Sequence, residues 1–213
     1  MKTFDAQQID PFWKWFGRSS DKLIRGVQKE RLTTQLDRRL RRIHPGLIWE
    51  IRPGASRPRQ LTISPNLDPN LRGIVQEIIF AAPPLKHWDL SAVRQAKDWN
   101  YRLLVRKFGA GHLEIDVSKW SFVLLCCSSG KHQVLLSGEN VSPLAKKQRW
   151  KAAGDALVNI LGEEMVLDAM DGFELVRRMP SMIATRSKPI SLLRETIMVP
   201  AAGNCLESGV QCV

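Results

Sequence analysis

The order of helix-like and strand-like segments, separated by proline and glycine, is the feature that most constrains this fold. A charged helical pattern ends at the Pro45–Gly46 pair, and two alternating, strand-like segments follow it. A second helical pattern has Asp68 as its N-cap and Pro69 at its first position. Short strand patterns and one more amphipathic helical pattern complete the sequence. This order predicts an α+β fold in which amphipathic helices pack on a mostly antiparallel sheet.

Periodicity and turn residues place the individual segments. Helices are expected at 21–43, 68–82 and 142–164. Strands are expected at 47–51, 60–64, 88–93, 112–117, 121–128 and 133–136, with a final strand or edge segment at 171–179. We expect the three strands between 112 and 136 to form an antiparallel meander, since only short turns separate them. The last helix is expected to pack through the face formed by Trp150, Ala153, Leu157, Ile160 and Leu161.

The first helical pattern, over 21–43, carries apolar residues on two opposite faces. Leu32, Leu36 and Leu40 share one face, whereas Leu23 and Val27 lie nearly opposite them. Either the helix bends near 26–33, or its two halves pack against different elements.

Length and composition bound the domain organisation. At 213 residues and 44% hydrophobic content, the chain is long enough for one good core or two small domains. We expect a single α+β domain over residues 1–185 and a partly loose C-terminal segment over 186–213. If the chain divides, the poorly patterned stretch at 94–111 is the expected boundary.

We expect a cytoplasmic protein without membrane insertion. The longest nearly unbroken apolar run, 122–127, covers about a third of the roughly twenty residues that a membrane helix needs. The first ten residues contain aspartates and lack the apolar region of a secretory signal. In that compartment the cysteines are expected to be reduced thiols, namely Cys126, Cys127, Cys205 and Cys212.

Positive charge is concentrated near the start of the chain. The formal net charge is +11, and the segment from Lys14 to Arg59 holds thirteen lysines and arginines against four acidic residues. The arginines in this segment form two predicted groups, a stripe on the helix side away from the leucines (Arg31, Arg38, Arg41, Arg42) and a loop (Arg52, Arg57, Arg59). This basic character favours an acidic partner, which can be RNA, DNA, anionic lipid or an acidic protein.

Four aromatic residues in "FWKWF" precede the charged helix. If they form a helical turn, Phe12, Trp15 and Phe16 fall on one side and Trp13 on the other. We expect the first three to be buried and Trp13 to be exposed, which makes Trp13 a candidate contact residue. RNA-binding sheets usually carry aromatic residues on their strands, but the strands predicted here carry mainly aliphatic side chains. This weakens base stacking as the function of the four rings.

No established catalytic motif occurs in the chain. Signatures such as GxSxG, GxxxxGK[ST] and GxGxxG are absent, and the four histidines lack metal-ligand spacing, so we expect no cofactor and no metal. The nearest approach to a catalytic cluster is His112, Glu114 and Asp116, which alternation places on one face of a strand. The same pattern fits the solvated face of a half-buried strand.

Three segments, "FWKWF", "HPGLIWEI" and "LTISPNLDPNLRGIVQEIIFAAPPLKHW", carry a resemblance to a known family. Together they resemble an uncharacterised family of bacterial proteins with an FWxWF opening and an HPxLxFE-like strand. The resemblance covers about the first ninety residues, and it implies a bacterial cytoplasmic domain without a known activity. This chain departs from the pattern at Trp49, where the family has phenylalanine, and in its arginine-rich segment Arg38–Arg42.

The lack of catalytic motifs beside a basic surface favours a non-enzymatic globular protein that binds a macromolecule, and we expect this partner to be a protein. The alternative is a nucleic acid, bound through the basic N-terminal helix and the Arg52–Arg59 loop, with an affinity that falls steeply as salt rises. An enzyme of unknown reaction stays open as a third possibility. For either binding function the expected contact residues are Arg31, Arg38, Arg41, Arg42, Arg52, Arg57, Arg59 and Trp13.

Overall fold

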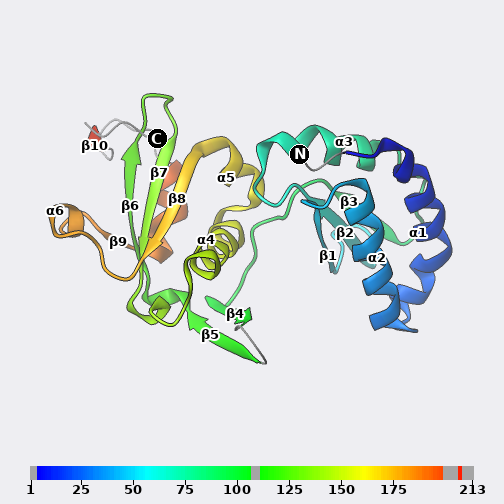
Figure 1. Cartoon of the computed structure of the whole chain (residues 1–213), viewed down its shortest axis with the longest axis horizontal. Coiled ribbons are helices and arrows are strands. Elements are labelled where there is room, and N and C mark those ends of the chain that lie inside the picture. Colours follow the sequence, from blue (N-terminus) through cyan, green and yellow to red (C-terminus); the bar gives the residue numbers. More distant parts are fainter. Residues whose placement is uncertain (1–3, 107–110, 199–205, 208–213) are drawn as a thin grey trace. The chain divides into compact units, whose positions relative to one another are not determined.

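The computed structural model describes residues 4–106, 111–198 and 206–207 of the chain (Figure 1). Its described residues form seven α-helices and three mostly antiparallel sheets, which confirms the predicted α+β fold class. The contacts group the chain into two compact units, Met1–Arg94 and Gln95–Val213, and the second begins within the stretch expected as the boundary. A grouping of contacts does not test independent folding, so a single domain over 1–185 stays a prediction.

The first unit combines three helices with a three-stranded sheet. Its helices are α1 (Ile9–Ile24), α2 (Lys29–Ile43) and α3 (Arg72–Phe80), with short 3₁₀ helices at Ala6–Gln8 and Pro69–Leu71. Its strands are β1 (Ile48–Arg52), β2 (Arg59–Ser64) and β3 (Trp88–Ser91). The β1–β2 pair is antiparallel, as predicted, and β3 runs parallel to β2. Asp68 accepts a hydrogen bond from the backbone N–H of Asn70, so it caps the 3₁₀ helix Pro69–Leu71 that leads into α3.

The expected helix over 21–43 is divided into two helices. Gly26 and Gln28 have φ angles of 72° and 52°, values that a right-handed helix does not contain. The turn that they form ends α1 and begins α2, so the two opposite apolar faces belong to two different helices. Leu23 is buried from α1, whereas Leu36 and Leu40 are buried from α2.

Aromatic and aliphatic side chains from all six elements fill the core of the first unit. Phe16 and Leu36 are completely buried, and the edge of the Phe16 ring meets Trp88 of β3 at a centroid distance of 5.0 Å. Ile63 of β2 and Ile78 of α3 are also completely buried. This single cluster fixes α1 and α2 against the sheet.

The second unit contains a larger sheet, a separate two-stranded sheet and four helices. Its strands are β4 (Arg102–Arg106), β5 (His112–Asp116), β6 (Ser121–Cys126), β7 (His132–Ser137), β8 (Met170–Val176), β9 (Lys188–Pro189) and β10 (Leu206–Glu207). Its helices are α4 (Lys146–Leu161), α5 (Glu163–Ala169), α6 (Ser181–Ala184) and α7 (Leu193–Met198), with 3₁₀ helices at Val117–Lys119, Glu139–Val141 and Ile190–Leu192.

The predicted meander of three strands is wrong in one respect. The β6–β7 hairpin is antiparallel, as expected, but β5 pairs with β4 in a sheet of its own. The strand β4 lies in the stretch 94–111, which has no clear strand pattern in the sequence. The strand β8 pairs parallel to β7, because α4 and α5 separate the two strands along the chain and return it to the same end of the sheet.

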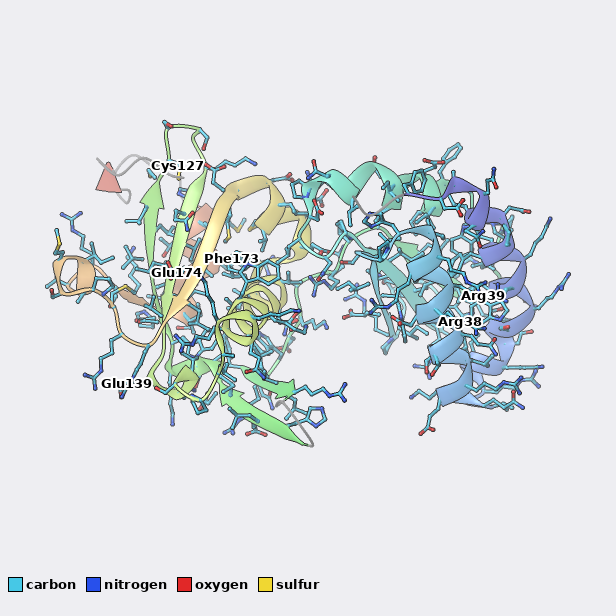
Figure 2. All side chains as sticks on the ribbon, in the orientation of Figure 1. Arg38, Arg39, Cys127, Glu139, Phe173 and Glu174 are labelled. Atoms are coloured by element: carbon cyan, nitrogen blue, oxygen red, sulfur yellow. The ribbon has the colours of Figure 1, made fainter. Side chains whose placement is uncertain are left out.

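Helix α4 packs mainly through the face that its periodicity predicts. Ala153, Leu157, Ile160 and Leu161 are buried. Trp150, expected on the same face, is instead half-exposed and stacks on Phe173 of β8, with ring centroids 5.5 Å apart (Figure 2 labels Phe173).

The described part of the C-terminal segment is packed on the second unit. Strand β9 pairs with β6, and Ile190 and Leu193 are completely buried. The looseness expected further along the chain, together with Cys205 and Cys212, falls outside the described residues. Cys126 and Cys127 are both disulfide-bonded, which contradicts the expectation of reduced thiols. That expectation was based on the compartment, and local sequence does not reveal how the chain brings cysteines together.

Candidate partner-binding surface

Helix α2 brings three of the predicted arginines onto one exposed strip. At about 100° per residue, Arg31, Arg38 and Arg42 fall within about 40° of one another around the helix axis. All three are exposed, and we call them the arginine strip. The opposite side of α2 carries leucines that are buried in the core, which fixes the direction of the strip. Figure 2 places Arg38 and its neighbour Arg39 on α2.

Along one side of the strip, residues of α2 contact helix α1. The indole Nε1 of Trp15 donates a hydrogen bond to Oε1 of Gln35 at 3.0 Å. The guanidinium carbon of Arg39 lies 5.0 Å from the centroid of the Trp15 ring, in cation–π geometry. These contacts hold α1 and α2 side by side and leave Trp15 only partly exposed. Local sequence does not reveal this arrangement, because Trp15 and Gln35 are twenty residues apart.

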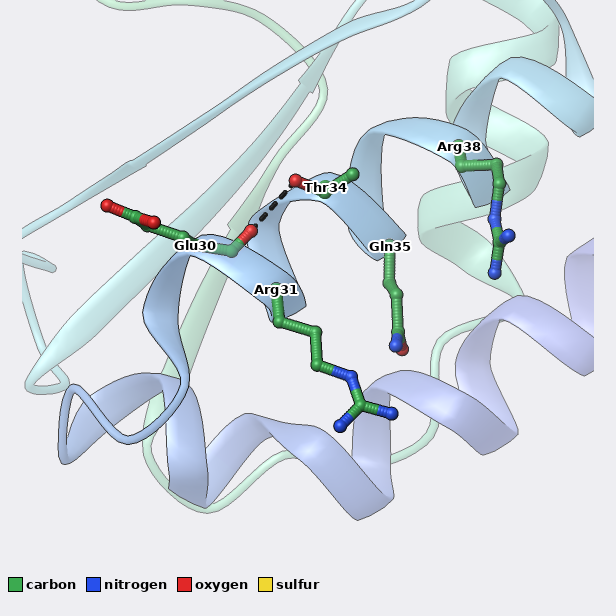
Figure 3. Close-up of a pocket in the computed structure, with 5 residues that line it drawn as sticks. All are labelled: Glu30, Arg31, Thr34, Gln35 and Arg38. Carbon is green, nitrogen blue, oxygen red and sulfur yellow. Dashed lines mark hydrogen bonds between the residues drawn. The ribbon is translucent and has the colours of Figure 1, made fainter.

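A shallow pocket of about 320 Å³ opens along the strip. Its lining residues are Glu30, Arg31, Thr34, Gln35 and Arg38. Figure 3 shows the side chains of Arg31, Gln35 and Arg38 pointing to the same side, toward α1, whereas the Glu30 carboxylate points away from Arg31. The Thr34 hydroxyl donates to the carbonyl oxygen of Glu30 at 2.8 Å, so this small side chain is bound back to its own helix.

The arginine strip has no internal counter-charge. Within the described part of the chain, none of its three guanidinium groups forms an ion pair with a carboxylate. Burial lowers the pKa of Arg39 from its usual value, and the positive charges of Arg42 and Arg38 lower it further. Arg39 Nε is also buried without a hydrogen-bond partner among the described residues. The strip therefore has a local excess of positive charge that an acidic partner would neutralise.

Arg41, which is predicted to belong to the stripe, lies beside the arginine strip, on a flank of α2 that we call the shoulder (Glu30, Asp37 and Arg41). It donates to Asp37, four residues earlier, with an Nε–Oδ2 distance of 2.7 Å. Glu30 lies on the same shoulder, close to Asp37 around the helix axis. The shoulder thus carries two carboxylates and one arginine that is already paired. The spacing from Asp37 to Arg41 is a signal that could have separated Arg41 from the other arginines.

The predicted arginine loop makes contacts within its own sheet. Asp89 of β3 accepts hydrogen bonds from the backbone N–H and the hydroxyl of Ser56, at 2.9 and 2.6 Å, and from the backbone N–H of Arg57 at 3.1 Å. The Arg57 Nε lies 3.9 Å from the same carboxylate. Arg52 donates to Oε1 of Gln60 at 3.3 Å, and Arg59 is half-buried. Arg52 and Arg57 therefore have polar partners in the fold, unlike the arginine strip.

The hydrogen bonds at Asp89 also set its protonation. The Ser56 hydroxyl and then the Ser56 backbone N–H lower the pKa of the Asp89 carboxyl below its usual value, while desolvation raises it and the N–H groups of Arg57 and Ala55 lower it further. Asp89 is therefore a carboxylate at neutral pH, and it holds the loop between β1 and β2 in one conformation.

Trp13 is buried, so the expectation of an exposed ring is wrong. Its side chain is only 2% exposed, and Nε1 donates to the carbonyl oxygen of Ile78 in α3 at 2.8 Å. Trp15, which was expected in the core, is the partly exposed ring. The buried positions of α1 follow a helical spacing that starts before the aromatic segment: Ile9, Phe12, Trp13, Phe16, Ser19, Ser20 and Leu23.

The possible catalytic cluster at 112–116 consists of groups with structural contacts. Glu114 forms an ion pair with Arg102 across the β4–β5 pair. Asp116 accepts from the backbone N–H of Ser118 at 3.1 Å and caps the following 3₁₀ helix. The hydrogen bond from the Ser118 hydroxyl is the main cause that lowers the pKa of Asp116. His112 is exposed and is the first residue of β5.

Metal sites, membrane helices and relatives are the other features from which a function could be assigned. Among the described residues, no group of three or more His, Cys, Asp and Glu side chains is arranged to hold a metal ion. No helix in the described ranges is both long enough and apolar enough to cross a membrane. Comparisons with protein-family models, curated proteins and solved structures found no match. The resemblance to the FWxWF family stays a prediction.

Proposed function

We propose that this protein is a non-enzymatic binding protein whose partner is another protein, bound through the arginine strip of α2. The observation that carries the proposal is the lack of counter-charge at Arg31, Arg38 and Arg42, next to an open pocket on the same helix. Exposed arginines are common contact residues in protein interfaces, because a planar guanidinium can bind a carboxylate with two hydrogen bonds. A cytoplasmic location and a bacterial family remain part of this proposal.

Nucleic acid is the second candidate, favoured by the exposed cations beside the strip. Arg18 and Lys22 are exposed and lie three and seven residues after Trp15, on the side of α1 that borders α2. Two other observations weigh against it. Trp13, the one ring expected as an exposed contact residue, is buried and so is not available for base stacking, and Arg57 of the loop is paired with Asp89. The protein partner is therefore the better supported function.

Recovery of partners from a nuclease-treated bacterial lysate tests the proposal. The bait proteins are the wild type, an Arg38→Gln/Arg42→Gln variant of the strip, and a Lys14→Gln/Arg41→Gln control. The control removes the same charge from cations that are paired with Asp10 and Asp37 at 2.7 Å. We expect a stoichiometric acidic protein to be retained by the wild type and the control, and to be lost with the strip variant.

Parallel preparations from the same lysate without nuclease treatment separate the two candidates. Retained material that absorbs at 260 nm after a high-salt wash and disappears on nuclease treatment, with an affinity that falls steeply with salt, would favour nucleic acid. Equal recovery of the protein partner by the wild type and the strip variant would contradict the proposed surface.

A further inference from the structure

We infer that the segment recognised by the arginine strip is an acidic α-helix whose carboxylates lie in a single stripe. This inference depends on the proposed function and adds the shape and chemistry of the partner. The spacing of the strip, the charge of its shoulder and the pocket beside α1 each support a helical partner.

The spacing of the arginines matches that of a helix. Arg31, Arg38 and Arg42 are seven and four residues apart, and they span about 16 Å along α2 at 1.5 Å per residue. A second α-helix of the same period presents acidic residues at i, i+7 and i+11 with the same separations when it is parallel to α2. An antiparallel helix does so with acids at i, i+4 and i+11. Each guanidinium then meets one carboxylate without a change in the backbone of α2.

The shoulder of α2 limits how far the negatively charged surface of a partner can extend across this helix. Glu30 and Asp37 lie on one side of the strip, and Arg41 is already paired with Asp37. A duplex nucleic acid has negative charge along both strands, so part of it would lie over these carboxylates. An amphipathic helix with acids on one stripe and uncharged residues on its flanks avoids this repulsion. Charge complementarity therefore favours an acidic surface that does not extend over the shoulder.

The pocket provides a defined place for such a helix. Gln35, one of its lining residues, is held by the hydrogen bond from Trp15, and Arg39 is held over the same ring. The two strip arginines that line the pocket point to the same side in Figure 3. Because these contacts hold α2 against α1, a partner helix binds there without ordering new backbone in this protein.

Fluorescence anisotropy with defined probes tests the inference on the full chain. The first probe is an alanine-rich peptide of about 20 residues with glutamates at i, i+4, i+7 and i+11, which serves both orientations. The second has the same glutamates distributed around the helix, and the third is the striped peptide with a central proline that breaks the helix. The fourth is a DNA duplex of about 20 base pairs. Measurements are made near 150 mM salt, where distant charges are screened.

The striped peptide is expected to bind about tenfold more tightly than the distributed and the proline peptides, because only it pairs several carboxylates at once. The Arg38→Gln/Arg42→Gln variant should lose most of this preference, and the Lys14→Gln/Arg41→Gln control should keep it. Equal binding of the three peptides, still weakened in the strip variant, would overturn the helical partner but leave the proposed function in place. Binding of the duplex alone, or of no probe, would overturn both.

Discussion

Replacement of Trp13 and Trp15 by alanine measures which of two neighbouring tryptophans belongs to the core. Trp13 is 2% exposed, and its ring is packed against Phe12 and Phe16 at centroid distances of 4.8 and 5.7 Å. Truncation of a buried tryptophan costs about 3–5 kcal/mol, since it leaves a cavity. In this chain it also leaves the Ile78 carbonyl without the indole N–H that it accepts from.

The expected loss of unfolding free energy at Trp15 is smaller because its side chain is only partly buried. The variant Trp15→Ala removes one hydrogen bond to Gln35, of about 1 kcal/mol, and a cation–π contact with Arg39 of about 0.5–1 kcal/mol. With the loss of partial burial, we expect about 2 kcal/mol in total. The two variants should therefore differ by at least about 1 kcal/mol in the free energy of unfolding.

Urea unfolding of the full chain, followed by far-UV circular dichroism, gives these free energies. The two compact units can unfold in separate transitions, so native-state hydrogen exchange at the amides of α1 and α3 assigns the loss to the first unit. Trp13→Phe is a milder variant in case Trp13→Ala does not fold, and it should cost about 1–3 kcal/mol through the lost hydrogen bond. A cost for Trp15→Ala as large as that for Trp13→Ala would refute the assignment of Trp13 to the core.

Three further predictions concern the loop between β1 and β2 and, as a matched control, helix α1. Gly54→Ala should destabilise the protein by about 1–3 kcal/mol in urea unfolding, because its Cβ would lie 2.4 Å from the Arg57 carbonyl oxygen and 2.5 Å from Asp89 Oδ2. Gly17→Ala in α1, which meets nothing within 4 Å, should instead stabilise it by about 0.5–1 kcal/mol. Asp89→Asn should lower the urea midpoint at pH 7. Since the Asp89 pKa is depressed in the fold, its contribution is present above the ordinary aspartate pKa of about 3.9 and is lost as pH falls through the folded value, so the difference between the two midpoints should shrink as pH falls below the ordinary value. A difference that stays constant as pH is lowered from about 7 through this acid range would show that the Asp89 charge does not hold the loop.

Local sequence signals are sufficient to predict most helices and strands of the first unit. The Pro45–Gly46 pair precedes β1, and the Asp68–Pro69 pair precedes α3, because capping and turn chemistry depend on a few adjacent residues. The β6–β7 hairpin was predictable for the same reason. The β4–β5 pair and the parallel β7–β8 pair were not, since the choice of partner strand depends on tertiary packing that no local pattern encodes.

The exchange of roles between Trp13 and Trp15 has a different cause. A single turn of helix does not define which side is buried, because its apolar residues cover a wide arc. The register of α1 becomes clear only when Ile9 and Leu23 are included, since both are buried at a helical spacing from Trp13 and Phe16. The turn at Gly26–Gln28 hid this register, because it joined residues of α1 to the pattern of α2.

The arginine strip is not explained by a general shortage of acidic residues on these helices. Lys14 and Arg41 each have an aspartate four residues earlier, and both pairs form at 2.7 Å. The residues three and four positions from Arg31, Arg38 and Arg42 are all uncharged or positive. Three of these relations, Arg38 to Arg41, Arg38 to Arg42 and Arg39 to Arg42, place like charges together, which destabilises an isolated helix. A helix face that served only to be solvated would gain stability from an acid at any of these positions. The stability that is lost because these positions carry no acidic residue is regained when an acidic partner is bound. This is the physical reason to look for the function at this strip.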